Sequence, residues 1–155
     1  MPKRTFGPFM RTVVFKRLQR ILDDGTVAFA GGREADLHAL RIAVKRLRYN
    51  IEFASSLAPD GAREALDLLA RLQERLGALA DFDAFERGYA ALLDGLAPND
   101  PRRIGIEALR AASQGDRDRA LADARAFWLA EPPYPERLAA SISAAFGSNS
   151  PKPEP

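Results

Sequence analysis

The sequence predicts an all-α protein of one domain, and three observations support this prediction. Apolar residues recur at helical spacing through most of the 155 residues. Alternating strand-type patterns, and hairpin turns between β-branched runs, are missing. Hydrophobic residues make up 46% of the chain and charged residues 28%, a balance typical of a protein with a packed core. We therefore expect a helical bundle of four long helices followed by shorter C-terminal helices.

The first two long helices are predicted from their apolar faces. The first covers about residues 6–22 and ends at Asp23-Asp24-Gly25, before a loop that contains Gly31-Gly32. The second covers about residues 34–57. The apolar faces consist of Met10, Val14, Leu18 and Ile21 in the first helix, and of Leu37, Leu40, Val44, Leu47 and Ile51 in the second.

Two further long helices are expected over about residues 62–79 and, after Gly77, over about residues 81–96. In the third helix apolar residues alternate at spacings of three and four, which favours packing against a nearly antiparallel helix. This seam consists of Ala62, Ala65, Leu69, Leu72, Leu76 and Leu79.

Shorter helices are expected at about residues 102–112 and 116–129, separated by Gly115, and at residues 136–146. The low-complexity end is expected to be disordered. The predicted organisation is therefore a bundle over residues 1–130, a short C-terminal helix over residues 131–146 and a disordered tail over residues 147–155.

The composition excludes several kinds of functional site. Cysteine is absent, which removes disulfides, thiolate metal sites and cysteine nucleophiles. His38 is the only histidine, so histidine-rich metal sites are excluded, while a carboxylate site for Mg²⁺ or Ca²⁺ stays open. The acidic pairs Asp81/Asp83 and Asp116/Asp118 stand near expected helix starts, where capping is the favoured role. No apolar run approaches the ~18–20 residues of a membrane span, and no secretory signal is recognisable, so we expect a cytoplasmic protein.

Positive charge is concentrated in the first third of the chain. Residues 1–50 hold 11 basic and 4 acidic side chains, whereas residues 51–155 hold 12 and 17. In the second helix, basic side chains gather within ~100° of one another, opposite the apolar stripe. Like charges at this spacing repel one another, so the face indicates an anionic partner. The face comprises His38, Arg41, Lys45, Arg48 and Tyr49, with Arg46 at its edge and Glu52 one turn further on.

The first helix carries Lys16, Arg17 and Arg20 away from its apolar face. If the two helices are neighbours, their basic faces line one groove in which guanidinium and ammonium groups would hold an extended polyanion. More ordinary roles stay open as well. The basic stripe is equally typical of a solvated face, and a lone histidine is often a structural hydrogen-bonding residue. Tyr49 is expected at the edge of the core, and Phe127 and Trp128 within it.

The segment from Leu37 to Phe53, LHALRIAVKRLRYNIEF, closely resembles the signature helix of the CHAD (conserved histidine α-helical domain) family. That signature has the form H-x-x-R-[IV]-x-x-[KR]-[KR]-[LI]-R. Downstream, Leu72-Gln73-Glu74-Arg75-Leu76-Gly77 followed by Asp81 is similar to the family element L-Q-x-x-L-G-x-x-x-D. Trp128 is similar to an aromatic residue often found near the end of a late helix. The resemblance covers roughly residues 5–130.

The resemblance implies a non-enzymatic module that needs no cofactor and binds inorganic polyphosphate in a basic cavity, at polyphosphate granules in the cytoplasm. By resemblance the polyphosphate-binding positions are His38, Arg41, Lys45 and Arg48, together with Arg46. The basic face of the first helix adds Lys16, Arg17 and Arg20 to these polyphosphate-binding positions. Asp81 is expected to orient a cationic side chain rather than to contact phosphate.

The family usually has two four-helix repeats, each with a signature helix, whereas this chain has one and looks most like the second. Two chains would then pair as a homodimer to rebuild the two-repeat arrangement, because a self-complementary interface needs only one surface. The other outcomes are a single repeat that binds weakly, or one that no longer binds.

Three alternative functions remain. Basic faces also suit nucleic acids, although the balanced overall charge and the presence of Tyr49 as the single suitable aromatic residue disfavour this interpretation. A phosphohydrolase or phosphotransferase would need carboxylates that face the phosphate, and Glu52 is the only acid that extends the basic stripe. A helical interaction scaffold would follow if the basic faces were paired with the acidic second half.

Overall fold

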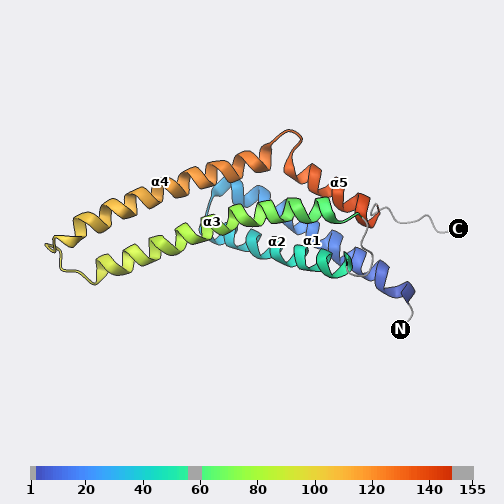
Figure 1. Ribbon diagram of the computed structural model, residues 1–155, viewed down its shortest axis with the longest axis horizontal. Coiled ribbons are helices and arrows are strands. Elements are labelled where there is room, and N and C mark those ends of the chain that lie inside the picture. Colours follow the sequence, from blue (N-terminus) through green and yellow to red (C-terminus); the bar gives the residue numbers. More distant parts are fainter. Residues whose placement is uncertain (1–2, 56–60, 148–155) are drawn as a thin grey trace.

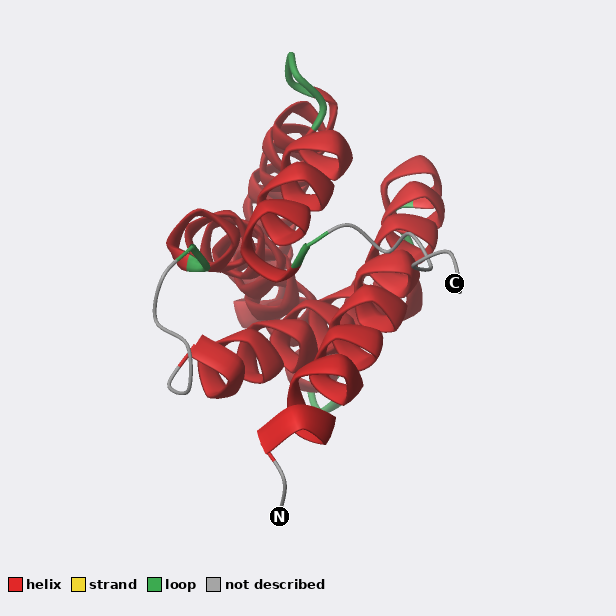
Figure 2. Cartoon of the chain, turned by 90° about the vertical axis from the view of Figure 1, so that its right-hand side faces the viewer, coloured by secondary structure: helices red, strands yellow, loops and turns green. Residues whose placement is uncertain are grey.

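A computed structural model of the chain describes residues 3–55 and 61–147. These residues form five helices and no strand, joined by short connections (Figures 1 and 2). The helices are α1 (Lys3–Gly31), α2 (Glu34–Ser55), α3 (Arg63–Asp94), α4 (Arg102–Leu129) and α5 (Tyr134–Phe146). The predicted all-α helical bundle is therefore confirmed.

Successive long helices pack against one another: α1 on α2, α2 on α3 and α3 on α4, while α5 contacts α1, α3 and α4. The start of α1 and the end of α5 lie at one end of the molecule, and the α3–α4 turn lies at the other (Figure 1). The predicted apolar faces of α1 and α2, and the seam of α3, are all buried in one core. Phe29, Trp128 and Tyr134 form an aromatic cluster within that core. The ring centroid of Trp128 lies 5.2 Å from that of Phe29 and 5.3 Å from that of Tyr134.

The predicted end of the first helix at residues 23–25 is wrong, because α1 continues to Gly31. Asp24 forms an ion pair with Arg20 one turn earlier, so this carboxylate is satisfied within the helix. Gly25 is buried beneath the ring of Trp128 and serves close packing rather than termination. The helix ends at Gly31, nearly two turns later, and is followed by Gly32, which adopts a left-handed φ of 67° that favours glycine.

The predicted breaks at Gly77 and Gly115 are also wrong. Residues 62–79 and 81–96 belong to the single helix α3, and residues 102–112 and 116–129 to the single helix α4. A glycine inside a helix costs about 1 kcal/mol, whereas burying one leucine stabilises by about 1.5–3 kcal/mol. Leu76 and Leu79 are both buried next to Gly77, so tertiary packing outweighs the local propensity.

The acidic pairs therefore lie inside α3 and α4 rather than at helix starts, so the predicted capping role is wrong. Asp83 is buried in α3 and forms an ion pair with Arg117 of α4, and Asp116 forms one with Arg119. Asp81 is exposed.

The last predicted helix is confirmed as α5, which begins two residues earlier than expected. Its side chains Tyr134, Leu138 and Ile142 are fully buried in the same core as α1–α3. The Tyr134 hydroxyl donates a hydrogen bond to the Leu68 carbonyl (3.2 Å), and its burial raises the pKa of that hydroxyl. The predicted tail lies outside the described residues from residue 148 onward.

Candidate polyanion-binding site

The candidate site is the outward surface of α2 and the groove between α2 and α1. Burial of Leu40, Val44 and Leu47 fixes the rotation of α2, and the opposite side of the helix therefore faces outward. Glu34 and Asp36 stand in the first turn of α2, where their negative charge complements the helix dipole. Helix packing thus presents the basic signature residues at the surface.

The structure divides the eight predicted cationic residues between the two sides of α2. One set lines a groove of about 600 Å³ between α1 and α2, whose apolar floor includes Val13, Ile42 and Ala43. The cationic residues of this groove are Lys16, Arg17, Arg20 and Arg46. The expectation that the basic faces of both helices line one groove is met for α1, whereas α2 contributes only Arg46, from the edge of its basic face.

His38 and Arg41 lie on the other side of α2, where they border a hollow of about 50 Å³ against α3. Asp83 and Arg87 of α3 line the same hollow. Since one water molecule occupies about 30 Å³ in the liquid, this space holds a water-sized group and not a phosphate chain. A polyanion that contacts Arg41 must therefore lie on the outer surface.

Arg41 has an unsatisfied donor. Its Nε is buried and has no hydrogen-bond partner within residues 3–55 and 61–147. Buried donors are nearly always paired, and an unpaired one costs about 1–3 kcal/mol. An oxygen atom from a bound phosphate or a water molecule would satisfy this group.

Arg48 is held by neighbours more firmly than the other basic residues. Its Nη1 donates a hydrogen bond to Gln73 Oε1 of α3 (3.0 Å), and its Nε lies 3.0 Å from Glu52 Oε1. Gln73 belongs to the L-Q-x-x-L-G element, and its positioning of Arg48 was not predicted from the sequence. The sequence signal that could have identified Gln73 was its position in that motif.

Tyr49 is 48% exposed and not at the edge of the core as predicted. Lys45 Nζ lies 5.7 Å from the centroid of its ring and Arg48 Cζ lies 5.6 Å from it, both within the range of cation–π attraction. Trp128 is buried as predicted, while Phe127 is partly buried against the core and carries the Arg75 guanidinium 4.1 Å above its ring centroid.

Within the described chain, no basic residue of the site forms an ion pair with a residue of α3, α4 or α5. Arg20 pairs with Asp24, and Arg48 pairs with Glu52, in each case within one helix. Asn50, with its amide oriented to satisfy both of its polar atoms, accepts a hydrogen bond from Arg17 Nε (3.2 Å). In the described part of the chain, six residues of the set form no ion pair: Lys16, Arg17, His38, Arg41, Lys45 and Arg46.

A buried clamp supports the hollow beside Arg41, and the sequence did not reveal it. Arg117 Nε donates to Asp83 Oδ1 (2.5 Å), and Arg117 Nη2 lies 3.5 Å from the Gly32 carbonyl oxygen. The clamp joins α3, α4 and the connection between α1 and α2. Because Asp83 and Arg117 stand 34 positions apart in two helices, no local pattern reports their pairing.

The family model for the CHAD domain matches residues 2–87. The chain belongs to the CHAD family. The match includes the signature helix α2, the α1 residues of the groove and the part of α3 that carries Gln73 and Asp83. CHAD domains are non-catalytic binding modules known in general for binding polyphosphate. No curated protein and no solved structure matches the chain.

Two further structural features concern metal binding and membrane insertion. No group of three or more His, Cys, Asp or Glu side chains that could hold a metal ion exists within residues 3–55 and 61–147. No helix formed by the described residues is long and apolar enough to cross a membrane.

Proposed function

We propose that this CHAD domain is a non-enzymatic module that binds inorganic polyphosphate on the outward surface of α2 and in the groove between α1 and α2. The observation that carries the proposal is a set of five lysines and arginines that form no ion pair within the described chain, on two adjacent helices of a CHAD domain: Lys16, Arg17, Arg41, Lys45 and Arg46. Their charges repel one another, and a bound polyanion relieves that repulsion.

The path of the ligand follows from the two rows of cations. Lys16, Arg17 and Arg46 face the open groove, which has room for a chain of phosphates. His38, Arg41 and Lys45 form the second row along about 10 Å of α2, at 1.5 Å per residue. A flexible polyphosphate lying across α2 contacts both rows. Arg20 and Arg48 contribute positive charge while they stay anchored by Asp24 and Glu52.

The first prediction concerns charge reversal in each row. Lys45→Glu in one row and Arg46→Glu in the other are each expected to weaken binding of labelled long-chain polyphosphate by about tenfold, because each removes a charge-assisted contact worth about 1.5 kcal/mol. The double variant Arg41→Glu/Lys45→Glu should lose more. Titration at two salt concentrations should also give a smaller salt dependence in each variant, because fewer counterions are released.

Arg102→Glu is the matched control, since Arg102 is an exposed arginine in the first turn of α4, at the opposite end of the molecule from the start of α1. It should bind like the wild type. Equal losses in the control and in the site variants would indicate nonspecific attraction and contradict the proposed site. Failure of the wild type to bind at low salt would overturn the function and leave the fold intact.

One observation favours a second candidate, single-stranded nucleic acid. Tyr49 is exposed beside Lys45 and Arg48, and an aromatic ring next to cations is a stacking site for bases. Competition between polyphosphate and single-stranded RNA separates the two ligands. Tyr49→Leu should reduce RNA binding and leave polyphosphate binding unchanged if the ring stacks on bases.

The interpretation as an interaction scaffold requires the basic faces to be paired with acidic residues of the second half, and of the described ion pairs of the site only Arg48–Glu52 involves such a residue. We further propose that two chains pair to supply the second repeat of the usual arrangement, and that the dimer associates with polyphosphate granules. A dimer presents two basic surfaces, which raises the effective concentration of cations along one long ligand.

A further inference from the structure

The groove between α1 and α2 has an apolar part that inorganic polyphosphate does not use. Eight side chains line the groove, four of them cationic and four apolar. The apolar ones are Val13 of α1 and Ala39, Ile42 and Ala43 of α2. A chain of phosphates is charged along its whole length and offers these side chains no apolar surface. The groove therefore suits a ligand that combines anionic groups with an apolar part.

The apolar and cationic side chains are separated along the groove. The helices run antiparallel (Figure 1), and Arg17 of α1 donates a hydrogen bond to Asn50 of α2 (3.2 Å). This contact sets Arg20 near the level of Arg46, so the four cations are clustered. Val13 lies on one side of the cluster. The other three apolar residues lie about 5–10 Å from Arg46 along α2, toward its connection with α1. They are here called the apolar end: Ala39, Ile42 and Ala43.

We propose that the groove binds a nucleoside polyphosphate, with the base on the apolar end and the phosphates among Lys16, Arg17 and Arg46. The inference deepens the proposed function and rests on it, because the same cations hold the phosphates. These three cations form no ion pair in the described chain, so their charges are available to a ligand. The face of a base is flat and apolar, and aliphatic side chains cover it well.

The size of the groove fits such a ligand. Its volume of about 600 Å³ falls within the range of roughly 300–1,000 Å³ that is typical of small-molecule sites. The apolar end extends over four residue steps of α2, or about 6 Å, which is comparable to the length of a base. A lipid acyl chain spans half of a bilayer core, about 15 Å, and would extend well beyond this end.

The apolar end gives the base no polar side chain to recognise. Alanine and isoleucine have no side-chain donor or acceptor, so Ala39, Ile42 and Ala43 contact the face of a base and do not read its edge. ATP and GTP should therefore bind alike. The phosphates supply the electrostatic part of the affinity, and the base adds an apolar part that inorganic phosphates lack.

Calorimetric titration with metal-free ATP, GTP and inorganic tripolyphosphate tests the inference. Tripolyphosphate is at least as negatively charged as ATP, so cations alone would bind it equally or more tightly. We expect both nucleotides to bind about tenfold more tightly than tripolyphosphate. That factor corresponds to about 1.4 kcal/mol, or the burial of about 55 Å² of apolar surface on the base.

The ligand series separates this inference from the proposed function. If long-chain polyphosphate binds but the nucleotides bind no more tightly than tripolyphosphate, the inference is overturned and the function stands. If long-chain polyphosphate fails to bind while the nucleotides are preferred, the function fails and the nucleotide site stands. A preference confined to one of the two nucleotides would overturn recognition by apolar contact.

Two uncharged substitutions at the apolar end test where the base lies. Ala39→Gln, at an exposed position, and Ile42→Asn should each lower the ratio of ATP affinity to tripolyphosphate affinity from about ten toward one. Arg46→Glu should instead weaken both ligands by a similar factor and preserve the ratio. Ala84→Gln, at an exposed alanine of α3, is the matched control and should change neither affinity. A ratio that neither Ala39→Gln nor Ile42→Asn alters would overturn the placement of the base.

Discussion

Gly25 and Trp128 meet in the middle of α1, at a point where the sequence alone suggested a helix end. A methyl group at position 25 would lie 2.2 Å from Cη2 of the Trp128 ring, much closer than atoms can approach. The ring is also packed on Phe29 and Tyr134 and has no free direction in which to move. Because Gly25 has no side chain, the indole ring of Trp128 fits into the core beside α1.

Gly25→Ala is accordingly expected to destabilise the protein, although alanine is the better helix former. The overpacking cost of about 1–3 kcal/mol exceeds the gain in helix propensity of about 1 kcal/mol. Gly77→Ala is the matched control, because no atom lies within 4 Å of the added methyl group. It should raise stability by roughly 0.5–1 kcal/mol. Urea unfolding measures both changes, and stabilisation by Gly25→Ala would contradict the packing.

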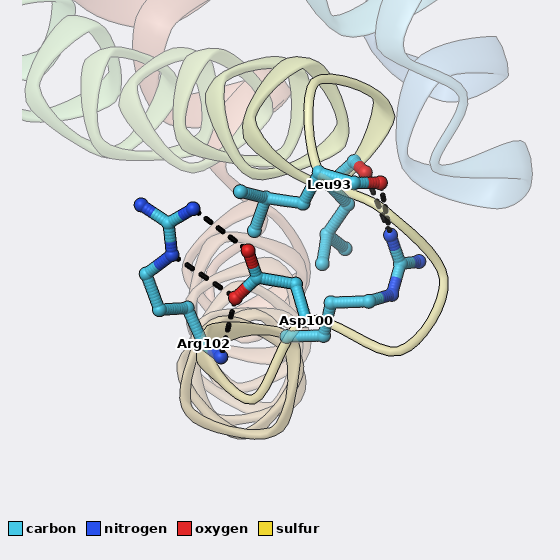
Figure 3. A network of polar contacts seen from close by, with 5 residues as sticks. Leu93, Asp100 and Arg102 are labelled. Atoms are coloured by element: carbon cyan, nitrogen blue, oxygen red, sulfur yellow. Dashed lines mark hydrogen bonds and ion pairs between the residues drawn. The ribbon is translucent and has the colours of Figure 1, made fainter.

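At the scale of the element, α3 and α4 are tied together at their turn by polar contacts (Figure 3). Asp100 accepts hydrogen bonds from the backbone N–H of Arg102 (2.9 Å) and from its Nε (3.0 Å). Arg103 Nη1 donates to the Leu93 carbonyl (2.7 Å) at the end of α3, which also accepts a hydrogen bond from the Leu96 N–H (3.2 Å). The turn thus provides hydrogen-bond partners for a backbone N–H group at the start of α4 and a carbonyl group at the end of α3.

These contacts predict how the turn responds to pH. The side-chain hydrogen bond from Arg102, together with its backbone N–H, lowers the pKa of Asp100 from 3.8 to about 2. Since the folded pKa is depressed, the stabilisation by Asp100 is present above pH 3.8 and is lost as the pH falls toward 2. Arg102→Gln should return the pKa of Asp100 toward 3.8 in a carboxyl NMR titration. An unchanged pKa in this variant would show that Arg102 is not the cause.

At the scale of the whole molecule, the core occupies only part of the α3–α4 pair. No residue between Leu79 and Ala120 belongs to the core cluster or packs against it, within the described chain. This segment, here called the arm, extends beyond α1 and α2 (Figure 1). Ion pairs such as Arg110–Glu86 hold its two helices together, while Phe85 and Leu92 of α3 stay exposed.

The arm is therefore expected to open more readily than the bundle. Hydrogen exchange should be faster for the amides of residues 86–114 than for those of α2, because fewer buried apolar contacts oppose local opening. Equal protection of the arm and of α2 would contradict the division into core and arm.

The sequence by itself determined the helical class, the core faces and the basic residues of α2. Hydrophobic spacing is a local signal, so it identified Leu40, Val44 and Leu47 as buried and placed Arg41 and Lys45 outward. The order of motif residues likewise indicated the CHAD family. These features depend only on residues within one or two helical turns of each other.

Only the tertiary structure decided where helices end and which cations meet. Gly25, Gly77 and Gly115 indicated breaks because local propensity disfavours glycine, yet α1, α3 and α4 each continue through them. The assignment of Arg46 to the α1 groove and Arg41 to the α3 side depends on which helix packs against each flank of α2. The pairing of Asp83 with Arg117 has the same origin, since contacts between distant segments leave no periodic trace in the sequence.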